Sequence, residues 1–268
     1  MRPATRSWTR FAVAVGAAWL LGACLPTPRA AADPVLAPAT AVAEPAADPA
    51  AWQRLAVLGA SASVGYGTQG DGGRPVGLAE ILDAALLVEH DPPAAHATDL
   101  FFINPEDWGR ILLDQALAEE PTAVVAIDYL FWFVYGGKES EEQRLQELER
   151  GLAGLARFRC PLVLGEIPDM SASVGKMLAR SQMPAAETLA AANRRLRAWA
   201  GDRDGTYLLV LAPRAGEGLI QADELHPTVL GLSGIALDAL RALPGGVQAA
   251  ERGDLLDDPE HLALQVQD

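Results

Sequence analysis

The sequence predicts an α/β domain in which a parallel sheet of about five strands is covered by helices on both faces. Short apolar runs alternate along the chain with longer segments whose apolar residues recur at helical spacing. This alternation is typical of parallel sheets, in which a helix connects one strand to the next. The composition agrees, because 50% of the residues are hydrophobic and 21% are charged, as in ordinary globular proteins.

Five runs are predicted as strands because they are short and apolar. The first ends at Gly59, and the third consists of β-branched and other apolar residues. In chain order the runs are Arg54–Leu58, Asp99–Ile103, Ala123–Ile127, Pro161–Leu164 and Tyr207–Leu211. In open sheets of this kind the ligand site lies beyond the carboxyl ends of the strands, so residues that directly follow a strand are the candidates for function.

Five longer segments are predicted as helices from the spacing of their apolar residues. One of them is expected to carry Pro184 in its first turn, and the last is expected to stop before Pro244-Gly245-Gly246. In chain order the helices are Leu78–Val88, Asp107–Glu119, Glu139–Phe158, Pro184–Ala200 and Thr228–Leu243.

The N-terminus has the pattern of a secretory signal peptide. Arginines precede an apolar run, Phe11–Leu21, which is too short for an ordinary transmembrane helix. The next residues, Leu21-Gly22-Ala23-Cys24, resemble a bacterial lipobox, in which the cysteine is lipidated and becomes the first mature residue. The alternative is a plain signal peptide that is cut elsewhere. The lipobox predicts an exported protein anchored through Cys24 to the cell envelope, at the outer membrane because Leu25 rather than Asp follows the cysteine.

These boundaries divide the chain into four segments. Residues 1–23 are the predicted lipoprotein signal peptide, and residues 24–51 are an Ala- and Pro-rich stretch that we expect to act as a tether. Residues 52–244 form the predicted α/β domain, and residues 245–268 form an acidic C-terminal tail.

Charge and residue spacing exclude some classes of function. The formal net charge is −14, which argues against a nucleic-acid partner, because phosphate binding needs clustered Lys and Arg. The two cysteines and four histidines show no metal-binding spacing. The sequence therefore predicts neither a metal nor another cofactor.

Two segments carry residues suited to nucleophilic catalysis. Ser61 follows the first predicted strand in Gly59-Ala60-Ser61-Ala62-Ser63, where glycine permits a tight turn. Asp223 and His226 lie between the last predicted strand and the last helix. A carboxylate beside an imidazole fixes its tautomer, and the imidazole can then activate a serine. Each segment alone also has a structural interpretation, as a turn or as a helix cap.

Together the two segments resemble the first and last conserved blocks of the SGNH (GDSL-type) hydrolases. The stretch from Asn104 to Gly109 is similar to that family's Asn-x-x-x-x-Gly stretch. The resemblance covers residues 54–243 and implies a flavodoxin-like, three-layer α/β/α fold. It implies Ser61 as nucleophile, His226 as base, Asp223 as the residue that orients the base, and the N–H groups of Ser61 and Gly109 as oxyanion-hole donors.

Two departures from the family pattern bear on activity. The Asp that precedes the serine in the family, where its role is mainly structural, is Ala60 here. The family's Gly-x-Asn-Asp block, whose Asn is the third oxyanion donor, is absent after the third predicted strand. Losing one such donor typically slows catalysis by about 10²–10³. Tyr129 or Trp132 could replace it, whereas Asp128 could either oppose the developing charge or make hydrogen bonds at the strand end.

The aromatic residues after the third strand have two interpretations. They follow a strand on the expected ligand side, so Asp128, Tyr129, Phe131 and Trp132 could line an apolar pocket for an acyl or sugar group. They could instead pack beneath the long helix Glu139–Phe158.

The sequence leaves two functions open. One is an envelope-anchored serine esterase or acyl hydrolase that acts through an acyl-enzyme on an acylated glycan, a lipid or a small ester. Acyl transfer to a sugar would use the same residues. The other is a non-catalytic SGNH-like module that binds a glycan or a partner protein, as the missing Asn suggests.

Overall fold

The computed structural model describes residues 52–69, 74–211, 218–245 and 259–267. The predicted signal peptide, Cys24 and the tether lie outside the described residues. Within the described ranges, no helix combines the length and the apolar character that crossing a membrane requires.

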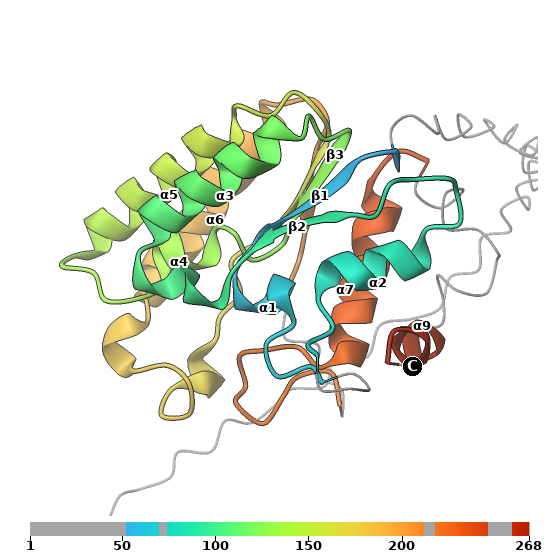
Figure 1. Cartoon of the computed structure of the whole chain (residues 1–268). Helices are drawn as coiled ribbons and strands as arrows, with labels where there is room; N and C mark the ends of the chain where they lie inside the picture. Colours follow the sequence, from blue (N-terminus) through green and yellow to red (C-terminus); the bar gives the residue numbers. More distant parts are fainter. Residues whose placement is uncertain (1–51, 70–73, 212–217, 246–258, 268) are drawn as a thin grey trace, which may run out of the picture. The chain divides into compact units, whose positions relative to one another are not determined.

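Five parallel strands form the central sheet in the order β2-β1-β3-β4-β5 (Figure 1). Val57 at the middle of β1 pairs with Ala95 of β2 on one side and with Val125 of β3 on the other. The strands are β1 (Leu55–Gly59), β2 (Ala94–Ala97), β3 (Ala123–Ala126), β4 (Leu162–Gly165) and β5 (Thr206–Leu209). The prediction of a parallel, flavodoxin-like sheet of about five strands is confirmed.

Helices cover both faces of the sheet, as predicted (Figure 1). One face carries α3 (Pro105–Ala118), α4 (Phe131–Val134), α5 (Glu141–Leu155) and α6 (Ala186–Gly201). The other carries α2 (Leu78–Ala85), α7 (Val229–Ala242) and α9 (Pro259–Gln265). Each face of the sheet packs against its helices in a separate apolar core. Because successive strand residues point to opposite faces, Leu58 lies in the core beneath α3 and α5, and its neighbour Val57 lies in the core beneath α2 and α7.

One predicted strand is wrong. Residues Asp99–Ile103 form the 3₁₀ helix η2, and the second strand is Ala94–Ala97. The hydroxyl of Thr98 accepts a hydrogen bond from the N–H of Leu100 and so caps η2. Within η2 only Phe101 is buried. The true strand lies at the edge of the sheet and is rich in alanine, so its apolar pattern is weak.

The residues expected to form an acidic tail contribute to the core. Part of that segment is the helix α9, in which Leu262 is fully buried and packs in the same apolar cluster as Leu240 of α7. The five predicted helices are present, with ends shifted by a few residues from the expected bounds. Helix α6 begins at Ala186 after the cap residue Ala185, so Pro184 lies just before the helix and not in its first turn.

A buried arginine on α5 holds the chain that leaves α4. The side chain of Arg144 is 3% exposed, and its guanidinium donates hydrogen bonds to the carbonyl groups of Val134 at 2.6 Å, Gly136 at 3.0 Å and Ser181 at 3.3 Å. It thereby ties the end of α4 to a loop far along the chain. Because α4 forms one wall of the site described below, Arg144 helps to fix that wall.

We expect Arg144→Met to lower the free energy of unfolding by about 2–4 kcal/mol, because buried carbonyl groups would lose their donors. Arg195→Met is the matched control, since the Arg195 side chain is 41% exposed and pairs with an exposed Glu149. Its loss should change stability by less than about 1 kcal/mol. Urea denaturation followed by circular dichroism measures both, and equal losses would contradict the role given to Arg144.

Candidate active site

Ser61 stands at the carboxyl end of β1, as the first residue of the short helix α1 (Ser61–Val64). Gly65 ends this helix with φ of 81°, a left-handed conformation that glycine adopts without steric cost. In the strand order, β1 lies between β2 and β3, where the direction of strand addition reverses. Ligands of open α/β sheets bind at this switch point, and Ser61 is partly exposed there.

The fold brings Ser61, His226 and Asp223 into one hydrogen-bonded chain. The ring Nε2 of His226 is 2.9 Å from Oγ of Ser61, a residue 165 positions away in the sequence. The ring Nδ1 of His226 is 2.7 Å from Oδ2 of Asp223. His226 is 3% exposed, and the ring of Tyr66 lies with its centroid 4.5 Å from that of His226. The imidazole is therefore shielded from water on the side that Tyr66 covers.

The positions of the protons on Ser61, His226 and Asp223 follow from which of their atoms can accept a hydrogen bond. An ionised carboxylate can only accept, so Nδ1 of His226 donates to Asp223 and Nε2 is left to accept the proton of Ser61. Burial raises the pKa of the Asp223 carboxyl, but hydrogen bonds from the His226 ring and from the backbone N–H groups of His226 and Leu225 outweigh it. The net effect holds the pKa of Asp223 below its ordinary value. Asp223 is thus ionised at neutral pH, and the serine hydroxyl faces a basic nitrogen.

Residues Asp223–His226 form a turn, called the histidine turn below. Two polar residues that the sequence analysis did not single out as functional hold this turn in place. The N–H of Gln221 donates to the carbonyl of His226 at 2.8 Å, and its side-chain amide donates to the carbonyl of Tyr66 at 2.6 Å. Gln221 therefore joins the histidine turn to the loop that follows α1. The buried hydroxyl of Ser173 donates to the carbonyl of Asp223 at 2.9 Å. These side-chain contacts join segments that are far apart in the sequence, so only the folded arrangement reveals them.

Asp128 follows Ile127, the first residue after β3. Its carboxylate holds residues Gly59–Ser63, which are called the serine turn below. Its Oδ1 accepts hydrogen bonds from the N–H of Ala60 at 3.0 Å and the hydroxyl of Ser63 at 2.6 Å. Its Oδ2 accepts from the N–H of Ala62 at 2.9 Å and the N–H of Ser63 at 3.2 Å. This carboxylate thus fixes the backbone on both sides of Ser61. Of the two roles considered for Asp128, these contacts establish hydrogen bonding at the strand end.

The lack of a side chain at Gly59 makes room for this contact. A Cβ at position 59 would lie 2.2 Å from Oδ1 of Asp128 and 2.2 Å from Oγ of Ser63. Such distances are far below van der Waals contact, so any larger residue would displace the carboxylate or the serine turn. The glycine at the end of β1 is therefore a packing requirement of the Asp128 contacts.

The N–H of Ser61 remains available. Asp128 occupies the neighbouring amides of Ala60, Ala62 and Ser63, whereas the amide of Ser61 donates to no acceptor among the residues that the structure describes. As the first residue of a helix, Ser61 has no intrahelical partner for this group. A free backbone donor beside the hydroxyl is the arrangement that an oxyanion hole needs.

Gly109 does not fit the role that the family resemblance implies. It lies inside α3, whose interior N–H groups are taken up by the helix ladder, and it does not line the cavity described below. A Cβ at this position would lie 2.8 Å from the ring of Phe133, so the glycine serves close packing of α3 on α4. Its stretch begins at Asn104, whose side chain caps α3 by accepting from the N–H of Asp107.

The aromatic stretch divides between the core and the site. Tyr129 is 2% exposed, and its hydroxyl donates to the carbonyl of Gly109 at 3.3 Å, so Tyr129 faces the core and not the pocket. Burial raises the pKa of Tyr129 above its ordinary value, which keeps the hydroxyl protonated. Phe131 and Trp132, in contrast, line the cavity together with Asp128. Both interpretations of the stretch are therefore correct for different residues.

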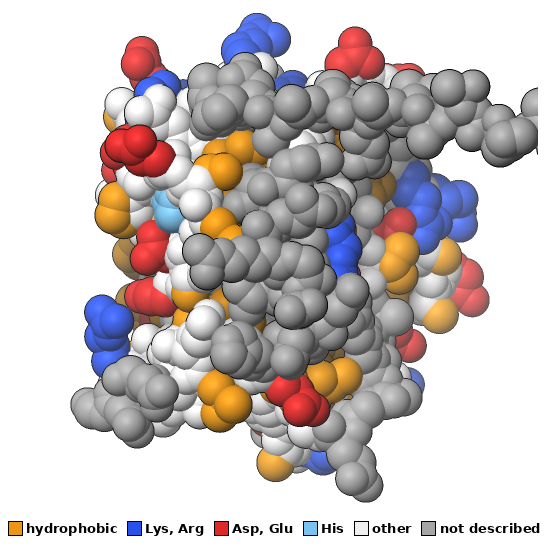
Figure 2. Space-filling model, turned by 90° about the vertical axis from the view of Figure 1, so that its right-hand side faces the viewer, with side chains coloured by type: hydrophobic (Ala, Val, Ile, Leu, Met, Phe, Trp, Pro, Cys, Tyr) orange, Lys and Arg blue, Asp and Glu red, His pale blue; other side chains and the backbone are white. Residues whose placement is uncertain are grey.

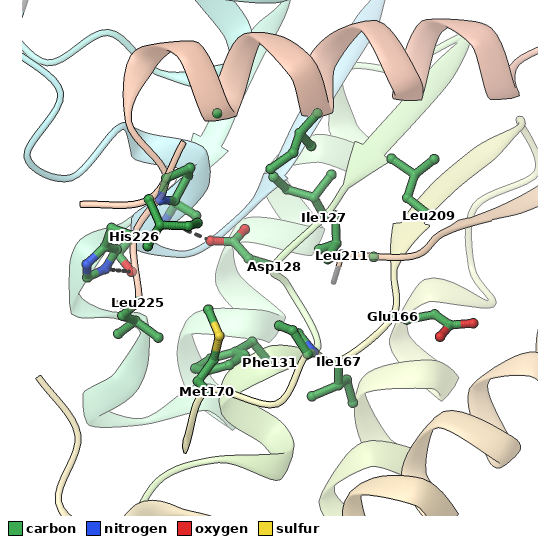
Figure 3. Close-up of a pocket in the computed structure, with 18 of the residues that line it drawn as sticks. Ile127, Asp128, Phe131, Glu166, Ile167, Met170, Leu209, Leu211, Leu225 and His226 are labelled. Atoms are coloured by element: carbon green, nitrogen blue, oxygen red, sulfur yellow. Dashed lines mark hydrogen bonds between the residues drawn. The ribbon is translucent and has the colours of Figure 1, made fainter. Parts of the chain in front are cut away.

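An apolar cavity opens beside Ser61 and His226. In Figure 3 the His226 ring and the Glu166 carboxylate lie at opposite ends of the view, with Asp128, Phe131 and Ile167 between them. Other apolar residues that line the cavity include Ile127, Met170, Leu209, Leu211, Leu225 and Ile235. A mostly apolar cavity with a few polar groups is typical of sites for small molecules.

Metal-binding side chains are not clustered in the part of the chain that the structure describes. No group of three or more His, Cys, Asp or Glu side chains within the described ranges is arranged to hold a metal ion. On the face shown in Figure 2, the acidic, basic and hydrophobic side chains drawn in colour are interspersed.

Comparison with known proteins finds similarity only among solved structures. No protein-family model and no curated protein matches the sequence. The structure titled "Crystal Structure of TesA" is 17% identical, with a TM-score of 0.47 over 74% of this chain and 100% of that one. The gut microbial diltiazem-metabolizing enzyme BT4096 is 15% identical, with a TM-score of 0.48 over 71% of this chain and 46% of that one. The chain thus spans less than half the length of BT4096.

We expect Asp128→Asn to lower the free energy of unfolding by about 2–4 kcal/mol. An amide of the same size offers one carbonyl oxygen and turns its NH₂ group toward N–H donors, so several buried donors lose their acceptor. Ser63→Ala removes only one of the hydrogen bonds to Asp128 and should cost about 1 kcal/mol. Urea denaturation compares the two variants, and a loss for Asp128→Asn no larger than that for Ser63→Ala would refute the proposed contact.

Proposed function

We propose that this protein is a serine ester hydrolase of the SGNH type that acts through an acyl-enzyme. The observation that carries the proposal is the hydrogen-bonded chain from Ser61 through His226 to Asp223, at the switch point of a parallel sheet and at the mouth of an apolar cavity. The two sequence segments that resemble the SGNH blocks are the segments that meet there.

In the first step the hydroxyl oxygen of Ser61 attacks the ester carbonyl carbon, and its proton passes to Nε2 of His226. The distance of 2.9 Å between these two atoms is within reach of direct proton transfer. The C=O double bond opens to a tetrahedral oxyanion. The N–H of Ser61 is placed to donate to that oxygen because it has no other acceptor among the described residues.

Collapse of the tetrahedral intermediate breaks the bond to the alkoxy group, which takes the proton from His226 and leaves as an alcohol. Water then attacks the acyl-enzyme, with His226 accepting the proton of the water and returning it to Ser61 as the acid is released. Asp223 stays ionised through both halves and stabilises the imidazolium that forms in each, since the surrounding N–H groups hold its pKa low.

The intact chain of three residues favours an enzyme over the binding module that the missing Asn suggests. A site that only binds needs no proton relay, yet here Gln221 and Ser173 brace the histidine turn and Asp128 braces the serine turn. Trp132 lines the cavity and carries an indole N–H, so it is the side chain through which a further oxyanion donor could be supplied.

We expect Ser61→Ala and His226→Ala to lower kcat/KM for p-nitrophenyl butyrate by at least about 10³, because each removes a member of one relay. Ser171→Ala is the matched control, since residues 171–175 repeat the Ser-Ala-Ser-Val-Gly sequence of residues 61–65. Ser171 is exposed, and within the described residues it makes no hydrogen bond to a histidine. A fluorophosphonate probe should label the wild type and not Ser61→Ala. Equal turnover by all variants, or no labelling of folded wild type, would reject the hydrolase.

The lipobox-like sequence at the N-terminus supports a second part of the proposal, namely that the enzyme is anchored to the cell envelope through a lipidated Cys24. The substrate would then be an ester that reaches the envelope. In this arrangement the tether of residues 24–51 would hold the domain away from the lipid surface.

We expect the full chain, expressed in a bacterium with an outer membrane, to sediment with the membrane fraction and to resist extraction by salt. A variant in which residues 1–24 are replaced by a cleavable signal peptide without a cysteine should move to the soluble fraction without loss of activity, because neither a lipid nor the apolar run Phe11–Leu21 would hold it at the membrane. Mass spectrometry of the mature N-terminus gives a second measurement. An unmodified Cys24, or equal membrane retention of both proteins, would exclude the anchor.

A further inference from the structure

We propose that the cavity beside Ser61 binds the acyl part of the substrate, and that this part is an uncharged, apolar chain several methylenes long. The inference rests on the proposed function, because it takes Ser61 as the atom that carries the acyl group. It narrows the substrate from esters in general to esters of apolar carboxylic acids.

The first argument is the direction in which the cavity extends. It starts at Ser61, which follows β1, and its wall continues with residues at the carboxyl ends of the next strands: Ile127 after β3, Ile167 after β4, and Leu209 and Leu211 at and after β5. Neighbouring strands are about 4.8 Å apart, so the wall from β1 to β5 spans roughly 14 Å. An acyl chain attached to Ser61 can therefore lie across the ends of three further strands.

The second argument is the apolar character of the other walls. On α7, Gly231 and Ile235 line the cavity and, being four residues apart, share one face of the helix. Phe131 and Met170 line it as well, and Figure 3 shows both next to each other below Asp128. Burying methylene groups between such walls is favourable, at about 0.8 kcal/mol per CH₂.

The third argument is charge. Among the described residues the lining includes three carboxylates and no Lys or Arg. Asp128 is occupied by the serine turn, and both oxygens of Glu166 accept hydrogen bonds from Arg197, at 2.6 and 2.5 Å. Asp238 pairs with Arg241 at 3.1 Å. The cavity thus offers an anionic acyl group no cationic partner, and it would have to bring that group toward carboxylates.

The test is a series of p-nitrophenyl esters hydrolysed by the full-length protein. We expect kcat/KM to rise by about fourfold for each methylene from acetate through butyrate to hexanoate, because each is buried in the cavity. The matched anion is p-nitrophenyl hydrogen adipate, which has the same chain as hexanoate with a terminal carboxylate. It should be hydrolysed at least about tenfold less efficiently than hexanoate. A rate that falls from acetate to hexanoate would overturn the inference.

A blocking variant tests where the chain lies. Ile235→Trp narrows the cavity, and we expect it to lower the ratio of kcat/KM for octanoate to kcat/KM for acetate by at least about tenfold. Ile111→Trp is the control, because Ile111 is 36% exposed on α3 and does not line the cavity. The same loss for acetate and octanoate in Ile235→Trp, or the same loss in both variants, would overturn the placement.

A binding measurement separates this inference from the hydrolase itself. Octanamide is neutral and unreactive, and titration calorimetry with Ser61→Ala should show it binding more tightly than butanamide, with Ile235→Trp weakening the binding. If octanamide binds in this way but no ester is hydrolysed, the cavity is a binding site for apolar chains and the proposed hydrolase activity is rejected. If esters are hydrolysed without preference for longer acyl groups and octanamide does not bind, the hydrolase activity is supported and the proposed acyl-binding role of the cavity is rejected.

Discussion

The contact between the Asp128 carboxylate and the serine turn is the constraint on which the site depends. Hydrogen bonds from Ala60, Ala62 and Ser63 hold the turn after β1 against the end of the neighbouring strand β3. Backbone N–H groups at such a turn need acceptors, and one carboxylate supplies them with both of its oxygens. The contact also explains Gly59, because the carboxylate fills the space where a side chain would stand. The position of the Ser61 hydroxyl follows from this packing.

The histidine turn is positioned by a different part of the chain. Gln221 links it to Tyr66 after α1, and Ser173, in the loop that follows β4, holds the Asp223 carbonyl. Asp128 thus holds the serine turn, whereas Gln221 and Ser173 hold the histidine turn, and Gln221 also joins the two turns where Tyr66 covers the imidazole. Such preorganisation matters because proton transfer between Ser61 and His226 tolerates little displacement.

Much of the fold could be predicted from local pattern, whereas the contacts within the site could not. Strand and helix periodicity is local, and the blocks around Ser61 and His226 each carry a recognisable sequence. The edge strand Ala94–Ala97 was missed because its small residues give a weak apolar signal, and the apolar run of η2 was mistaken for it. The acceptor role of Asp128 joins segments more than 60 residues apart, which no local pattern encodes. Tyr129 and Phe131 face different sides because the chain begins a short helix between them, so spacing alone could not assign them.

The same carboxylate bears on how the proposed reaction could proceed with fewer oxyanion donors than the family pattern has. Asp128 draws the amides of Ala60, Ala62 and Ser63 away from any ligand, and it leaves the N–H of Ser61 as the backbone donor beside the nucleophile. A negative charge near the site destabilises an oxyanion, but the hydrogen bonds that the Asp128 carboxylate accepts from the serine turn partly offset its charge. The apolar walls of the cavity exclude water, and a single preorganised donor is stronger there than in solvent. An apolar acyl group that fills the cavity would complete this exclusion, so the missing amide donor and the preference for such a group are connected by the same electrostatics.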